Sequence, residues 1–206
     1  MRVPHEDPKA VYKYLRAAHL HAVRASLEDH VARLDWPQQR IERYRTARLR
    51  SLLGFARERS PFHAARMADL DPATATVEDL VRLPPMVKQE AQDEWDAIVT
   101  TPDIDRVGAE RVLAQQRWFC YTPTGHQVFS SGGSSGVRGV YVWDWEQFIT
   151  LACLAWRWQV RAERASGSDV RPARLAVLEA GEPPHASTPL FDVSTGPLME
   201  TVVIPA

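Results

Sequence analysis

A run of serine and glycine in the middle of the chain has the residue types of an anion-binding loop. Residues 130–136 are all serine or glycine, and Arg138 and Gly139 follow after one valine. Glycines let backbone N–H groups converge on a ligand, serine hydroxyls donate hydrogen bonds, and a guanidinium offers a fork of donors that suits phosphate. The candidate phosphate ligands are Ser131, Gly132, Gly133, Ser134, Ser135, Gly136 and Arg138.

The residues on both sides of this loop predict the elements that position it. The segments 127–129 and 140–143 are rich in β-branched and aromatic residues, so we expect a strand, a small-residue loop and a second strand. Two familiar phosphate loops are excluded. No Gly-Lys-Ser/Thr follows, as it would in a Walker loop, and no helix follows directly, as it would in a dinucleotide-binding turn.

Two other interpretations of the tract remain open. Gly/Ser tracts are usually flexible linkers, although this one is short and lies between apolar, strand-like runs. Residues 132–136 also match G-x-S-x-G, the nucleophile motif of serine hydrolases, and Asp169 and His185 follow in a suitable order. That motif requires a helix directly after the serine, whereas 137–143 favours a strand.

Apolar residues at helical spacing predict two long helices in the first third of the chain. The first covers residues 9–34, and Asp35 is expected to cap the second, with Pro37 in its first turn. Ser60 and Pro61 should end the second helix and begin a short third one. The first stripe comprises Leu20, Val23, Leu27, Val31 and Leu34, and the second Ile41, Tyr44, Leu49, Leu52, Leu53 and Ala56.

The clearest helix follows the loop. Asp144 and Gln147 have the spacing of a capping box, and apolar residues on most sides of 145–160 predict burial on most sides. Shorter helices are expected at 88–96, with Trp95 facing inward, and at 103–113, and strands at 175–179 and 201–204.

Composition is ordinary for a globular protein and excludes several classes. The 206 residues are 45% hydrophobic and 25% charged with a net charge of -1, so no overall field favours nucleic acid or an anionic membrane. There is no apolar signal region, and the longest apolar run is too short to span a bilayer. Cys120 and Cys153 offer no disulfide framework, which favours a cytoplasmic protein. The early histidines are interpreted as core or surface residues rather than metal ligands: His5, His19, His21 and His30.

Three blocks of sequence resemble the adenylate-forming ligases, in particular the phenylacetate–CoA ligase-like branch. The loop at 131–139 is similar to the family's phosphate loop, T-S-G-T-T-G-x-P-K. Residues 48–62 resemble its LL-x-x-A-x-x-x-SPFY segment, and residues 80–90 its L-x-x-LP-x-x-TK-x-E segment. Gly132 stands where the family usually has serine, and Gly139 where many members have lysine.

The resemblance implies an α/β fold that corresponds to the front part of the large N-terminal ligase domain, a helical segment followed by a sheet with packed helices. Residues 1–114 would form a mainly helical wrap, and 115–206 an incomplete nucleotide-binding region. The implied reaction joins a carboxylic acid to AMP, using ATP and Mg²⁺, and passes the acyl group to coenzyme A. An aryl or arylalkyl acid is expected only by analogy. His185 would approach the substrate pocket, unless it is an ordinary exposed loop histidine.

The family's later motifs for adenine, ribose and the catalytic lysine have no counterpart before Ala206. We therefore expect a truncated chain that is inactive alone, and that self-associates or needs a missing C-terminal half. The alternative is a non-catalytic fragment that binds a nucleotide weakly or not at all. The expected ligand is a small carboxylic acid, with no nucleic-acid or membrane partner, and neither a catalytic residue nor a metal ligand is assigned.

Overall fold

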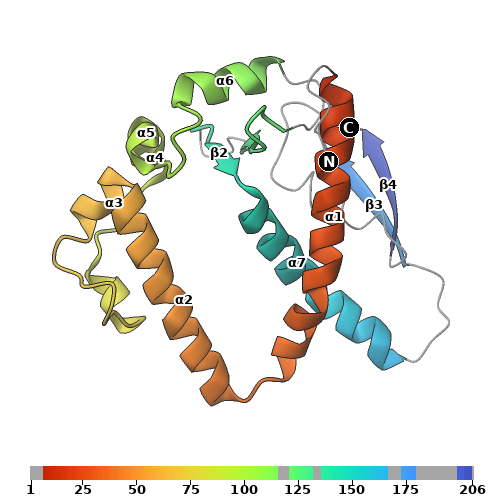
Figure 1. The fold of residues 1–206 in the computed structure, drawn as a ribbon, viewed down its shortest axis with the longest axis horizontal. Helices are drawn as coiled ribbons and strands as arrows, with labels where there is room; N and C mark the ends of the chain where they lie inside the picture. Colours follow the sequence, from red (N-terminus) through yellow and green to blue (C-terminus); the bar gives the residue numbers. More distant parts are fainter. Residues whose placement is uncertain (1–6, 116–120, 132–135, 167–172, 180–198, 206) are drawn as a thin grey trace.

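The structure is a computed structural model that describes residues 7–115, 121–131, 136–166, 173–179 and 199–205. Helices dominate these ranges, and the strands in them form two separate two-stranded sheets (Figure 1). The predicted α/β class is confirmed in this coarse sense, but a single sheet is not found among the described residues.

Two long helices from distant parts of the sequence form the main core. Helix α1 (Pro8–Ala32) packs along α7 (Trp145–Ser166), as Figure 1 shows. Because apolar residues recur on α1 every three or four positions, they form one stripe toward α7. The buried residues of this core are Val23, Leu27, Val31, Phe148, Ala152, Cys153 and Val160. The first helix is thus confirmed, apart from a final turn of 3-10 helix, η1 (Arg33–Asp35).

The beginning of α2 (Gln38–Arg59) differs from the prediction in two ways. Pro37 occupies the cap position, and Asp35 lies in η1 and pairs with Arg161 at 2.9 Å, so Asp35 is not a helix cap. The predicted buried stripe is confirmed only in part, because Leu53 is buried and Leu49 and Ala56 pack partly buried against the same core. Three members of the expected stripe are exposed: Ile41, Tyr44 and Leu52.

The end of α2 enters a second, smaller core. Leu53 packs with Met67, Leu70 and Ala75, next to the short helices α3 (Pro61–Arg66) and η2 (Glu78–Arg82). Ser60 caps α3, as predicted, because its hydroxyl accepts a hydrogen bond from the His63 amide at 3.2 Å. The same hydroxyl donates to the Ala97 carbonyl at 2.7 Å, and so ties α3 to the next helices.

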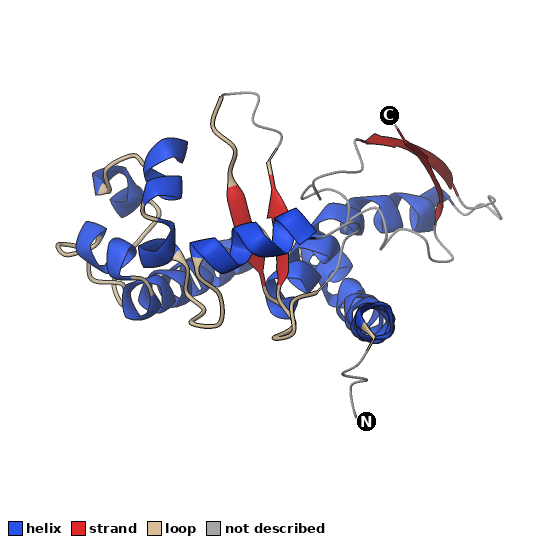
Figure 2. Ribbon diagram, turned by 90° about the horizontal axis from the view of Figure 1, so that it is seen from above, coloured by secondary structure: helices blue, strands red, loops and turns tan. Residues whose placement is uncertain are grey.

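The hairpin that carries the Ser/Gly loop has a third core on one face. Strands β1 (Gln127–Ser130) and β2 (Val140–Trp143) pair antiparallel, with Ser130 opposite Val140. The helices α5 (Trp95–Ile98) and α6 (Arg106–Gln115) pack against them, and α4 (Lys88–Asp93) contacts β2 through the Gln92 side chain. Figure 2 shows a helix lying across both strands, and the contacts identify it as α6. The buried side chains here are Trp95, Ala109, Leu113, Val128 and Val140.

The C-terminal part of the described chain contains the second sheet. Helix α7 begins as predicted, with the Gln147 amide donating to the Asp144 carboxylate at 2.8 Å. Its burial is less complete than predicted, since Leu154 and Trp158 are exposed. Strands β3 (Ala173–Glu179) and β4 (Met199–Pro205) confirm the two expected strands and pair in parallel with each other. Within the described ranges, no helix has the length and apolarity to cross a membrane.

Candidate functional site

The base of the Ser/Gly loop is closed by a two-bond pair. The Ser131 amide donates to the Gly139 carbonyl at 2.9 Å, and the Gly139 amide donates to the Ser131 hydroxyl at 2.9 Å. The predicted order of strand, loop and strand is therefore confirmed, and a helix does not follow directly. Because a serine hydrolase elbow needs that helix, the hairpin argues against the hydrolase interpretation.

Part of the predicted phosphate loop is described. Gly136 has a φ of 81°, a left-handed conformation that glycine adopts without strain, so this position requires glycine. Gly132, Gly133, Ser134 and Ser135 lie outside the described residues, and so does the substrate-pocket candidate His185.

The guanidinium of Arg138 is held by an acid from another element. It donates from Nη2 to Oε2 of Glu110, a residue of α6, and the other carboxylate oxygen accepts from Arg106 at 2.9 Å. Burial raises the pKa of Glu110, but the hydrogen bonds from Arg138 and Arg106 outweigh that effect and lower the pKa. Glu110 is therefore a carboxylate at neutral pH. An anion entering the loop must share Arg138 with it or displace it.

Gly139 lies directly against the Tyr141 side chain. A Cβ at this position would lie 2.5 Å from the Tyr141 hydroxyl and 2.6 Å from a ring carbon. The Tyr141 ring covers this part of the loop and packs on Phe129, with ring centroids 5.5 Å apart. A lysine at 139 would require Tyr141 to move.

Side chains from α4 and α5 occupy the outer edge of β2. The Val140 amide donates to the Gln92 side chain at 2.7 Å, and its carbonyl accepts from the Trp95 indole at 2.9 Å. Gln92 also accepts from Arg106 at 2.8 Å, which links the strand edge to the Glu110 cluster. Sequence reasoning identified Trp95 as buried, but it missed Gln92 and Glu110, because their roles depend on contacts that span at least 28 residues.

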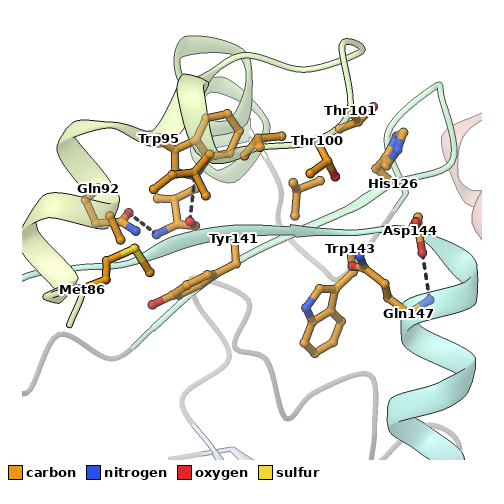
Figure 3. A pocket seen from close by; sticks show the side chains of 15 residues that line it. Met86, Gln92, Trp95, Thr100, Thr101, His126, Tyr141, Trp143, Asp144 and Gln147 are labelled. Atoms are coloured by element: carbon orange, nitrogen blue, oxygen red, sulfur yellow. Dashed lines mark hydrogen bonds between the residues drawn. The ribbon is translucent and has the colours of Figure 1, made fainter. Parts of the chain in front are cut away.

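A cavity of about 320 Å³ lies beside β2. In Figure 3, Trp95, Thr100 and Thr101 line it from one side, and Tyr141 and Trp143 come from the strand. His126 stands at its border, with Nδ1 3.0 Å from the Thr124 hydroxyl. The lining is mostly apolar, with aromatic rings from Trp95, Tyr141 and Trp143, and its one carboxyl group, that of Asp144, caps α7. Such a cavity suits a small, uncharged ring better than a phosphate group.

No three His, Cys, Asp or Glu side chains in the described ranges gather closely enough to hold a metal ion. Comparison of the chain with protein-family models, with curated proteins and with solved structures finds no match.

Proposed function

We propose that the loop at 131–139 binds the β- and γ-phosphates of ATP in an adenylate-forming reaction that activates a carboxylic acid. The observation that carries this proposal is the hairpin, whose strands hold the two ends of a Ser/Gly loop in fixed register. The pair between Ser131 and Gly139 closes the base of the loop and holds its two ends together. The three sequence blocks described above support the same reading.

Each part of the loop has a separate role in this proposal. Gly136 provides a left-handed turn in which neighbouring amides can converge on one anion. Ser134 and Ser135 supply hydroxyl donors, and Arg138 supplies a positive charge that can make two parallel hydrogen bonds to phosphate. Mg²⁺ would travel with the ATP phosphates, and we assign no described residue as its ligand.

The proposed reaction has two steps. A carboxylate oxygen attacks the α-phosphorus of ATP, and the bond from that phosphorus to the β-bridging oxygen breaks, so that pyrophosphate leaves with the electron pair. The thiolate of coenzyme A then attacks the acyl carbon, and AMP leaves. The protein contributes mainly by positioning and by stabilising charge on the phosphates. An aryl or arylalkyl acid is the substrate class that the resemblance favours.

The ion pair between Arg138 and Glu110 favours a second candidate. Because the arginine is already paired, the loop would bind ATP weakly, and the chain would be a non-catalytic nucleotide-binding or partner-binding unit. The two candidates differ in one product. A ligase releases AMP only when ATP, coenzyme A and a suitable carboxylic acid are all present.

Binding of MgATP, measured by isothermal titration calorimetry, tests the loop. The Arg138→Ala variant should weaken binding about tenfold, the effect of losing one charge-assisted contact. The Glu110→Gln variant removes the competing charge and should tighten binding several-fold. The side chains of Arg138 and Glu110 are 44% and 35% exposed, so solvent screens their ion pair. The expected gain in ATP-binding free energy is therefore only about 1 kcal/mol.

A matched control is Arg111→Ala, which removes an exposed arginine from the same helix and should leave ATP affinity unchanged. Equal affinities for wild type, Arg138→Ala and Glu110→Gln would show that the loop is not the phosphate site. Assays of AMP release with a panel of aryl and alkyl carboxylic acids then separate the ligase from the non-catalytic candidate.

A further inference from the structure

A second cavity, which we call the interhelix cavity, lies between α1, η1, α2 and α7. Its volume is about 740 Å³, and its lining comes from the segments 30–48 and 150–158. Cavities that hold small molecules in proteins are of this size. It is separate from the Ser/Gly hairpin, because no residue of the hairpin lines it and its lining on α7 begins at Thr150.

The lining of the interhelix cavity is positively charged. Arg33, Arg48 and Arg157 contribute guanidinium groups, and the lining contains no carboxylate. None of the three arginines forms an ion pair with an acid in the described part of the chain. By contrast, Arg161, one turn further along α7, is paired with Asp35 at 2.9 Å. The cavity therefore gathers positive charge that the described residues do not neutralise.

Two buried polar atoms in this lining lack partners. His30 is only 7% exposed, and its Nδ1 has no hydrogen-bond partner. The Nε atom of Arg157, a half-buried residue, also has no hydrogen-bond partner. Because both atoms are shielded from solvent, a ligand in the cavity would reach them only if neighbouring side chains moved. Burial, then the charges of Arg33 and Arg157, lower the pKa of His30, while Asp29 opposes them. A negative charge among these groups would relieve that repulsion.

Aromatic rings line the interhelix cavity beside the aliphatic side chains of Leu34, Ile41 and Leu154. Trp36 and Tyr44 meet edge to face, with centroids 5.5 Å apart, and Arg33 donates to the Tyr44 hydroxyl at 2.9 Å. The Arg33 guanidinium also lies 5.0 Å from the centroid of the Tyr44 ring. Trp158 lines the cavity from α7 and is 59% exposed. The rings are thus fixed on one side and accessible on the other, which suits a flat ligand.

We propose that the interhelix cavity binds a small organic anion, an aromatic ring that carries a phosphate or carboxylate group. The acid group would lie among Arg33, Arg48 and Arg157 and accept hydrogen bonds from them. The ring would stack on Trp158, which is exposed, whereas the Trp36 ring is already covered by the Arg40 guanidinium at 3.9 Å from its centroid. This site is independent of the proposed ATP loop, because it shares no residue with it.

Calorimetric titration with four probes tests the proposal: 1-naphthyl phosphate, 1-naphthoate, 1-naphthalenemethanol and inorganic phosphate. The two naphthyl anions should bind, and the neutral alcohol and inorganic phosphate should each bind at least about tenfold more weakly. The naphthyl anion that binds with the higher affinity shows whether the cavity prefers a phosphate or a carboxylate group. Arg157→Gln should weaken the anions about tenfold. Arg48→Gln, at an exposed position where folding is not at risk, should weaken them too. Arg164→Gln, whose arginine pairs with Glu28 outside the cavity, is the matched control.

Several results would overturn the proposal. Equal affinity for the neutral alcohol would mean that the cavity recognises only apolar surface. Equal affinity for inorganic phosphate would mean that the rings contribute nothing. The proposal also fails if Arg48→Gln binds as tightly as wild type, or if neither naphthyl anion binds at millimolar concentration.

Discussion

We expect His19 to make the free energy of unfolding depend on pH between neutrality and pH 5. It lies on α1 with only 1% of its surface exposed, its Nδ1 contacts the Tyr121 hydroxyl, and its Nε2 has no hydrogen-bond partner. The imidazole also meets the Trp145 ring edge to face at 3.5 Å between centroids. Burial, and then the charge of Arg16, lower the pKa of His19 from 6.5 to about 3.

The sign follows from proton uptake. Between pH 6.5 and pH 3 the unfolded chain protonates this imidazole and the folded chain does not, so acid favours the unfolded state. A pH of 5 is about 1.5 units below the pKa of this imidazole in the unfolded chain. The free energy of unfolding at pH 5 should therefore be about 2 kcal/mol lower than at pH 7. Carboxyl groups such as Glu28 have a pKa that the folded structure lowers from its ordinary value of 4.5. Their contribution to stability is lost only below that pH, so they do not account for a change between pH 7 and 5.

Urea unfolding followed by tryptophan fluorescence at pH 7, 6 and 5 measures the effect. The His19→Gln variant replaces the imidazole with a group that does not titrate, so its stability should fall by about 2 kcal/mol less than that of wild type between pH 7 and 5. His21→Gln changes an exposed histidine on the same helix and should keep the wild-type pH dependence. If wild type and His19→Gln lose the same free energy on acidification, the imidazole is hydrated in the folded protein and the argument from burial is wrong.

Two substitutions test the contacts that join separate elements. Ser60→Ala removes the cap of α3 and the hydrogen bond to the Ala97 carbonyl, so it should lower the free energy of unfolding by about 1–3 kcal/mol in urea titrations. The control Ser51→Ala, on the exposed side of α2, should change that free energy by less than about 0.5 kcal/mol. Trp95→Phe leaves the buried Val140 carbonyl without its donor and should cost about 1–3 kcal/mol; an unchanged thermal midpoint would show that this bond contributes nothing.

Local sequence patterns predicted the elements whose signals lie within a few residues. The α7 cap depends on Asp144 and Gln147, three residues apart, and the α3 cap on Ser60 with Pro61 behind it. The hairpin follows from β-branched and aromatic residues on either side of the loop. In each case the physical cause is a backbone preference or a short-range hydrogen bond, so the prediction needed no knowledge of tertiary packing.

Contacts between distant residues were not predictable in this way. Periodicity showed that Ile41, Tyr44 and Leu52 share a helix face. It did not show that this face stays exposed in the described part of the chain, where Ile41 and Tyr44 line the interhelix cavity instead. The partner of Arg138 depends on α6 crossing the hairpin, which brings Glu110 to the loop from 28 residues away. A single sequence carries no signal for that crossing.

The side chains that cover the edge of β2 limit how this protein can associate. An unpaired strand edge is a template on which a strand from another molecule can add, and this is a common route to aggregation. Alternate residues of a paired strand turn their amide and carbonyl groups away from the partner strand, and at Val140 both groups are already bonded to Gln92 and Trp95. An incoming strand would have to break both bonds before it gained any. At the start of β2, two side chains from neighbouring helices thus oppose the addition of a strand, without proline or an inward-pointing charge on the strand itself.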